Sequence, residues 1–185
     1  MTGIRVCIVT TILTIVYVAL SVATTNLLLH NKSVGSLIKL DGKIIGSKLI
    51  GQNFKTNIFF HGRPSLNNYN GGLSGNSELS YFSNERNENI SSNYKRFKTQ
   101  NQNQEPDLNL ITESASGLDP HITYNGALSQ IDKITQSTNI DRKDLLKIIN
   151  KKAKPRAFGL YGEKIINVLE LNLELKKIYA KTSRS

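Results

Sequence analysis

The chain has 185 residues, with 24 lysines and arginines against 14 acidic residues, so its formal net charge is +10 at pH 7. This length suits one domain of ordinary size and requires no second one. A single cysteine, Cys7, excludes an internal disulfide framework and a zinc site built from cysteines. Apart from a short cluster at residues 151–156, the basic residues are dispersed. Without an RNA-binding signature, they predict a solvated surface and no nucleic-acid partner.

The first element is an uncharged run from Val6 to Leu29, which follows a short N-terminal segment, residues 1–5. As a helix this run would measure about 36 Å, enough to cross a hydrocarbon core of roughly 30 Å. We therefore predict a single transmembrane helix at residues 6–29 and a cell-membrane location. A cleaved secretory signal is the alternative, with residues 21–23 (SVA) as the cleavage site.

One face of this predicted helix is polar. Its members fall within roughly 100° of the helical wheel; they are Thr10, Thr14, Tyr17, Ser21, Thr24 and Thr25. Small hydroxyl residues let a second helix approach closely and hydrogen-bond to it, so this face predicts packing against a partner in the membrane. Alternatively, each hydroxyl bonds to a carbonyl of its own helix four residues earlier.

After the span, Asp41-Gly42 separates two short apolar stretches, residues 36–40 and 43–45. Because a type I′ turn needs positive φ at both central residues, this pair predicts a β-hairpin. Residues 46–54 then carry glycines at both ends of a short apolar core, and residues 57–65 end on a Gly-Arg-Pro break. We expect strand ends and ordered loops there.

Residues 71–77 (GGLSGNS) predict a flexible turn or an anion-binding nest of backbone amides, although the P-loop lysine is absent. Ser77 is expected to cap a helix whose apolar positions keep an approximate helical period. These positions are Leu79, Phe82, Ile90, Tyr94 and Phe97. Residues 99–107 predict a polar linker, and the alternation at residues 108–112 predicts a strand.

A tight turn at residues 114–122 (SASGLDPHI) precedes a helix expected from its N-cap Thr123 to about Gln136. A second helix is expected to start at Asp141 and to end near Pro155.

The C-terminal part, residues 164–172, is interpreted as an internal strand, and a charged tail is expected from Glu174 onward. The predicted architecture is therefore one N-terminal transmembrane helix followed by one mixed α/β (α+β) domain at residues 30–185.

No catalytic pattern stands out. Ser116, Asp119 and His121 are neighbours in sequence, but neighbours rarely form a triad, and Asp119 before Pro120 is typical of a turn. A secreted hydrolase that uses Ser116 and His121 is nevertheless one alternative. Three scattered histidines without an H-E-x-x-H pattern predict no metal site. The P-loop pattern and the Asp-Lys-Thr-Gly-Thr phosphorylation motif are also missing, so we expect no ATP hydrolysis by this chain alone.

Four segments, taken in order, resemble the C subunit of the Kdp potassium-transporting ATPase (KdpC). They are GSKLIGQNF at 46–54, FFHGRPS at 59–65, ITESASGLDPHI at 111–122 and INVLELNLEL at 166–175. The resemblance implies a non-catalytic, single-pass subunit of a P-type ATPase complex, in which an A subunit conducts potassium and a B subunit hydrolyses ATP. It also implies that the chain stabilises this complex and acts as a catalytic chaperone that raises the ATP affinity of the B subunit. No tightly bound cofactor is expected, and ATP is implied by the resemblance alone.

The sequence departs from the family pattern in three places. Glu113 stands where the family usually has alanine, residues 74–77 alter a Ser-Gly-Gly-Ser-Asn stretch, and residues 124–125 replace a Pro-Glu helix start. These departures weaken a nucleotide-contacting role for the glycine-rich loop, whereas the turn at 116–121 matches intact. We predict interaction or loop-fixing sites at Gln52, Arg63, Ser65, Ser116, Gly117, Asp119 and His121.

Two observations conflict on membrane orientation. The residues after the span include Lys32, Lys39, Lys43 and Lys48, whereas only Arg5 precedes it, so the positive-inside tendency would keep the domain in the cytoplasm. The resemblance places the domain outside, and long domains often translocate regardless of flanking charge. We expect an extracytoplasmic domain, which could not meet cytosolic ATP directly. The main alternative function is a membrane-anchored extracytoplasmic binding or scaffold protein unrelated to potassium.

Overall fold

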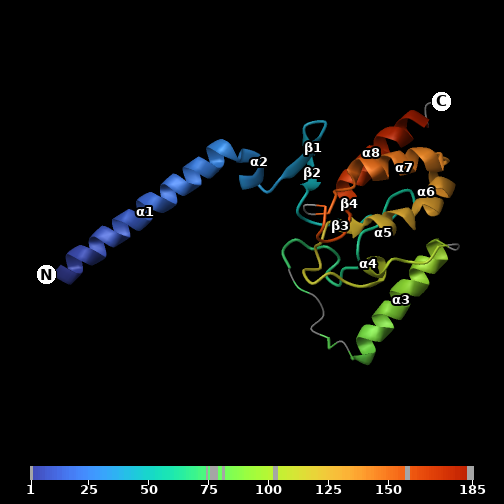
Figure 1. Cartoon of the computed structure of the whole chain (residues 1–185), viewed down its shortest axis with the longest axis horizontal. Coiled ribbons are helices and arrows are strands. Elements are labelled where there is room, and N and C mark those ends of the chain that lie inside the picture. The colour runs from blue at the N-terminus through green and yellow to red at the C-terminus, as the bar shows by residue number, and fades with distance from the viewer. Residues whose placement is uncertain are drawn as a thin grey trace. The chain divides into compact units, whose positions relative to one another are not determined.

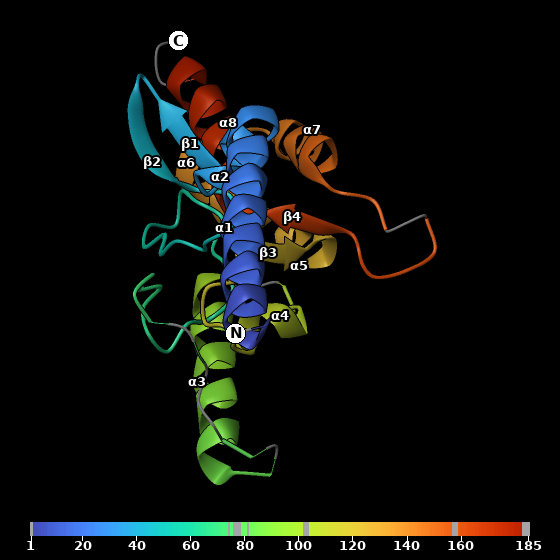
Figure 2. The ribbon, with the colours of Figure 1, turned by 90° about the vertical axis from the view of Figure 1, so that its left-hand side faces the viewer.

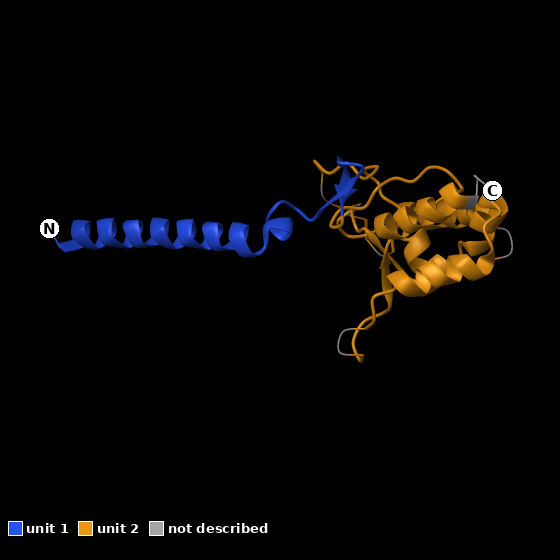
Figure 3. Cartoon of the chain, turned by 90° about the horizontal axis from the view of Figure 1, so that it is seen from above, with its two compact units in different colours: residues 1–47 blue, residues 48–185 orange. Residues whose placement is uncertain are grey.

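The computed structural model describes residues 2–73, 75, 79–80, 82–101, 104–156 and 159–182. Its contacts divide the chain into two compact units, residues 1–47 and residues 48–185, which are blue and orange in Figure 3.

The first unit begins with α1 (Thr2–Leu28), the long blue helix of Figure 1. With 27 residues and no buried side chain, α1 is long and apolar enough to cross a membrane. The predicted span is thus one continuous helix. Four hydroxyls of the predicted polar face donate to carbonyls one turn earlier, for example Thr14 Oγ1 to Thr10 O at 2.9 Å and Ser21 Oγ to Tyr17 O at 2.8 Å. Within this chain the hydroxyls therefore follow the self-bonding alternative, while packing against a partner stays a prediction.

A short helix, α2 (His30–Ser33), leads to the antiparallel strands β1 (Leu37–Leu40) and β2 (Lys43–Ser47). Asp41 and Gly42 between them have φ values of 49° and 76°. Both angles are positive, so the structure confirms the predicted hairpin turn.

The second unit is a mixed helix and strand domain. Its described elements are α3 (Asn84–Gln100), α4 (Leu108–Ile111), β3 (His121–Thr123), α5 (Tyr124–Leu128), α6 (Ile131–Thr138), α7 (Arg142–Lys152), β4 (Ile165–Asn167) and α8 (Val168–Thr182). Strands β3 and β4 pair antiparallel, with Ile122 opposite Ile166. Helix α7 packs against α6 and α8. In Figures 1 and 2, α3 lies at one end of this unit and α8 at the other.

The core of this domain lies among β3, β4 and helices α5 to α8. Its fully buried side chains include Phe60, Ile131, Ile134, Leu145, Ile149, Leu171 and Leu175. Phe60 belongs to an irregular segment, so the core holds a loop as well as regular elements.

Local capping signals predicted two helix starts correctly. Thr123 Oγ1 accepts from Gly126 N at 2.9 Å at the start of α5, and Asp141 Oδ1 accepts from Lys143 N at 2.9 Å at the start of α7. The helix expected from Thr123 to Gln136 is, however, two helices. The chain turns at Ser129 and Gln130, whose side chains both donate to Gly126 O and so compete with helix continuation.

Two strand predictions are wrong. Residues 108–112 contain the short helix α4, because Asp107 caps it by accepting from Asn109 N at 2.9 Å. Of residues 164–172, only β4 is a strand, and α8 then replaces both the rest of that strand and the expected charged tail. The Asn167 side chain accepts from Glu170 N at 3.1 Å and caps α8. An alternation of apolar and polar residues over about five positions does not distinguish a strand from the buried face of a helix.

Helix α3 starts later than expected. Ser77 lies outside the described residues, and the observed cap is Ser83, whose hydroxyl accepts from Arg86 N at 3.4 Å. Leu79 and Phe82 therefore precede the helix, and Phe82 is exposed. The expected polar linker begins only after Gln100, where Asn101 is buried.

Candidate functional site

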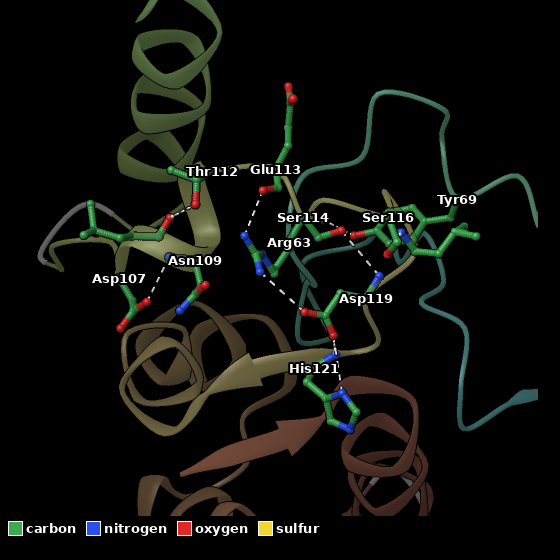
Figure 4. Close-up of polar contacts among 12 residues, drawn as sticks. Arg63, Tyr69, Asp107, Asn109, Thr112, Glu113, Ser114, Ser116, Asp119 and His121 are labelled. Carbon is green, nitrogen blue, oxygen red and sulfur yellow. Dashed lines mark hydrogen bonds and ion pairs between the residues drawn. The ribbon is translucent and has the colours of Figure 1, made fainter. Parts of the chain in front are cut away.

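Three irregular segments of the domain meet in one place. Residues 49–52, 61–69 and 113–121 form what we call the loop cluster, much of which is shown in Figure 4. Parts of three of the four segments that resemble the KdpC family, at 46–54, 59–65 and 111–122, are brought together here.

The centre of the loop cluster is an ion pair between Arg63 and Asp119 (Figure 4). Arg63 Nη1 lies 3.4 Å from Asp119 Oδ2, and Arg63 Nη2 donates to Glu113 O at 2.8 Å. Asp119 Oδ1 accepts from the backbone N–H of His121 at 2.9 Å and lies 3.3 Å from His121 Nδ1. Burial opposes ionisation of Asp119, but the hydrogen bonds and charge of His121, with the charge of Arg63, outweigh it and lower the pKa of this carboxyl.

The turn before Asp119 is fixed by its own serines. Ser116 Oγ accepts from Leu118 N at 3.1 Å, and Ser114 Oγ accepts from Asp119 N at 3.4 Å. Gly117 has a φ of 67°, and a Cβ there would come within 2.8 Å of Gly75 O. In Figure 4 the Ser116 side chain lies apart from the His121 ring, which contacts Asp119. The arrangement is therefore that of a rigid turn, without the serine–histidine contact of a hydrolase.

Ser65 and Tyr69 connect this turn to the second segment. Ser65 Oγ donates to Gly117 O at 2.7 Å and accepts from Tyr69 N at 3.0 Å. The Tyr69 hydroxyl donates to Arg63 O, and burial raises the pKa of this hydroxyl to about 12. No sequence pattern pointed to Tyr69. The sequence feature that relates to Tyr69 is the glycine at position 51. Any larger residue there would crowd Tyr69, because an added Cβ would lie 2.8 Å from its ring.

Gln52 is the remaining predicted site residue. It is partly buried and follows Gly51, whose N–H donates to Leu118 O at 2.7 Å. The structure thus places all seven predicted residues of the domain in or beside the loop cluster, while the predicted packing face belongs to α1 in the first unit.

Two buried side-chain amides hold the segment that enters the loop cluster; we call them the carboxamide clamp. Asn172 accepts from Phe60 N at 2.8 Å and donates to Phe60 O at 2.9 Å. Gln130 accepts from His61 N at 2.8 Å and donates to His61 O at 3.1 Å. The backbone N–H and C=O of both Phe60 and His61 are therefore hydrogen-bonded, as they would be in a sheet, but by side chains in place of a partner strand. Sequence reasoning missed both amides, although a polar residue within the apolar run of α8 was a signal.

A shallow open hollow of about 560 Å³ lies on the surface of the loop cluster. Its lining is mainly apolar, with the charged pair alongside, and comprises Leu49, Ile50, Arg63, Ala115, Ser116, Leu118, Asp119 and Pro120. Leu49 is 62% exposed. Exposed apolar side chains around a rigid, charged centre are typical of protein contact surfaces.

Comparison with known proteins identifies the family. The family model described as "K+-transporting ATPase, c chain" (KdpC) matches residues 1–177. Three relatives carry the name potassium-transporting ATPase KdpC subunit. The relative from Bacillus cytotoxicus is 37% identical over 88% of this chain and 86% of its own length. That from Bacillus cereus (strain Q1) is 36% identical over 89% and 87%, and that from Bradyrhizobium diazoefficiens is 37% identical over 80% of each. The chain therefore belongs to the KdpC family of K+-transporting ATPase subunits.

Proposed function

We propose that this chain is a non-catalytic subunit that stabilises a potassium-transporting P-type ATPase complex. Its partners are the A subunit, which conducts potassium, and the B subunit, which hydrolyses ATP. The loop cluster carries this proposal, because two family-like segments are locked together beneath an exposed apolar hollow. A preorganised apolar surface with a charged pair suits a lasting contact with another protein.

The roles of the polar side chains support a structural task. Ser116 and Asp119 accept hydrogen bonds from the backbone of their own turn, and Arg63 bridges that turn to the preceding segment. These groups are engaged in fixing the surface and form no nucleophile and base pair. We infer that the chain contributes a contact surface to the pump and leaves the chemistry of ATP to the B subunit.

The membrane helix offers the second contact. Its polar face, Thr10, Thr14, Tyr17, Ser21, Thr24 and Thr25, would pack against membrane helices of the A and B subunits. A hydroxyl oxygen that donates within its own helix can still accept a bond from a neighbour. With the domain on the extracytoplasmic side, the chain would raise the ATP affinity of the B subunit through the assembly, without contacting ATP directly.

Co-purification tests this proposal. Tagged A and B subunits in mild detergent should retain the wild-type chain. A Leu49→Glu variant, which places a charge in the hollow, should be retained at least several-fold less because the charge must be desolvated on contact. Leu160→Glu is the matched control, since Leu160 is also exposed, at 75%, and does not line the hollow. Absence of wild-type co-purification, with unchanged potassium uptake on deletion of the chain, would favour the unrelated scaffold alternative.

Two further measurements address the finer points. A reconstituted complex without this chain should need roughly tenfold more ATP for half-maximal potassium uptake; an unchanged ATP requirement contradicts the chaperone role. Protease added to intact cells should cleave the domain, whereas a fully protected domain contradicts the extracytoplasmic placement.

A further inference from the structure

A basic cleft lies on the domain between the segment 53–69 and helix α3. Its outer part has a volume of about 270 Å³, and an inner chamber has about 40 Å³. The two are adjacent, because His61, Gly62, Arg96 and Gln100 line both. The inner chamber has room for on the order of three water molecules or one small polyatomic ion.

The cleft carries charge of one sign. Its charged side chains are Lys55, Arg63, Arg96 and Lys133, and none of the described residues that line it is acidic. Arg63 is paired with Asp119, but the described partner of Arg96 is the neutral Asn93 Oδ1, at 3.1 Å. A recess lined by one sign of charge raises the local concentration of counter-ions.

Lys133 is the innermost cation. It is 3% exposed, and its Nζ lies 3.4 Å from Gln130 Oε1, a neutral oxygen that already accepts from His61 N. Burial lowers the pKa of Lys133 to about 8. Buried lysines are rare without a paired anion, because a lone buried charge is costly. An anion in the adjoining chamber would supply the missing countercharge.

Two more groups indicate which kind of anion the chamber would bind. Asn101 lines the chamber, and its Oδ1 is buried without a hydrogen-bond partner in the described part of the chain, so a ligand with an O–H donor would suit it. His61 Nε2 lies 3.1 Å from Thr56 O, to which it donates. Burial and the charge of Lys133 lower the pKa of His61 to about 4, so the ring is neutral at pH 7.

We propose that this cleft is a binding site for a phosphate-class oxyanion, with Lys133 and Arg96 as its cationic ligands. Hydrogen phosphate combines oxygens that accept from both cations with an O–H that can donate to Asn101 Oδ1. The phosphate group fits the inner chamber, and the outer part has space for an organic group attached to it. This inference does not depend on the proposed assembly role, because Lys133, Arg96 and Asn101 do not line the hollow on the loop cluster, although Arg63 lines both.

Calorimetry on the full chain in detergent at pH 7 tests the proposal, with inorganic phosphate and glycerol 3-phosphate as probes at constant ionic strength. Arg96→Gln should weaken phosphate binding roughly tenfold, and Lys133→Met should weaken it further. Lys95→Gln is the matched control, because Lys95 is exposed, lies next to Arg96 on α3 and does not line the cleft. Tighter binding of the monoester would assign the outer part to an organic group, and equal binding would indicate free phosphate.

A second readout keeps the test independent of folding defects. Bound phosphate should raise the pKa of His61, measured by NMR on histidine-labelled protein, by at least one unit above its value in chloride. The proposal is overturned by the absence of saturable phosphate binding to the wild type, by equal losses in the Arg96 and Lys95 variants, or by an identical His61 titration in both salts.

Discussion

The membrane helix and the loop cluster satisfy their polar groups over very different distances in sequence. In α1, Ser21 Oγ donates to a carbonyl four residues earlier. In the loop cluster, Arg63 donates to Glu113 O, 50 residues away, and the clamp joins Phe60 to Asn172 over 112 residues. Helix α1 can therefore form wherever its sequence enters a membrane, whereas the loop cluster exists only once the whole domain has folded.

The largest expected effect concerns the carboxamide clamp. Asn172→Leu leaves the buried N–H and C=O of Phe60 without partners and should lower the free energy of unfolding by about 3 kcal/mol. Thermal or denaturant unfolding of the full chain in detergent measures the loss. Asn87→Leu, on the exposed face of α3, should change stability by less than about 0.5 kcal/mol. Equal effects of the two variants would show that the long-range bonds contribute little.

Substitution of two glycines distinguishes the cost of backbone strain from the cost of close packing. Gly117→Ala should cost about 2–3 kcal/mol, because φ is 67° and the new Cβ would meet Gly75 O at 2.8 Å. Gly159→Ala, with a φ of 74° and open space around it, should cost only about 1 kcal/mol. If both substitutions cost the same, the contact between the turn and residue 75 does not constrain the loop cluster.

Asp119 makes the loop cluster sensitive to acid. Its pKa is lower in the folded chain than in the unfolded one, so its contribution is fully present above the unfolded pKa of about 4 and is lost as pH falls through the folded value. Asp119→Asn should therefore cost about 1 kcal/mol at pH 7 and less at pH 2.5. Unfolding curves at the two pH values check this. A stability difference that does not change with pH would show that the effect of the substitution does not come from the ionisation of Asp119.

The smallest effect on folding, and the sharpest contrast, is expected in α1. Ser21→Leu fills the polar face and should leave the helix intact, yet reduce co-purification with the A and B subunits several-fold. Ala19→Leu adds similar bulk on the opposite side of the helix and should have no such effect. Circular dichroism of the full chain checks the helix, and quantitative pull-down checks the contact. Equal retention of both variants would contradict the assembly role of this face.

Local features of the fold were predictable from the sequence. The hairpin turn at Asp41-Gly42 and the caps Thr123 and Asp141 each depend on residues within a few positions of one another. The strand predicted at 164–172 was wrong because that prediction also used only the local spacing of apolar residues. In α8 the buried residues Val168, Leu171 and Leu175 are spaced as on a helix.

The candidate site was predictable only in part. Resemblance to a family singled out the residues of the two loops, but their pairing depends on long-range geometry. Nothing local to Arg63 indicates that it contacts Asp119, and nothing near His61 indicates Gln130 or Lys133. A single sequence gives the spacing of residues along the chain and does not give the distances between segments that meet after folding.

The carboxamide clamp has a consequence for substitution. At Phe60 and His61 the clamp bonds only to the main chain, so it tolerates any side chain at those two positions except proline, which has no N–H to donate. Substitution at positions 60 and 61 can thus change the core and the basic cleft separately while the path of the backbone is retained. The opposite holds for positions 130 and 172, where even a change from amide to carboxylate removes a donor and adds a buried charge.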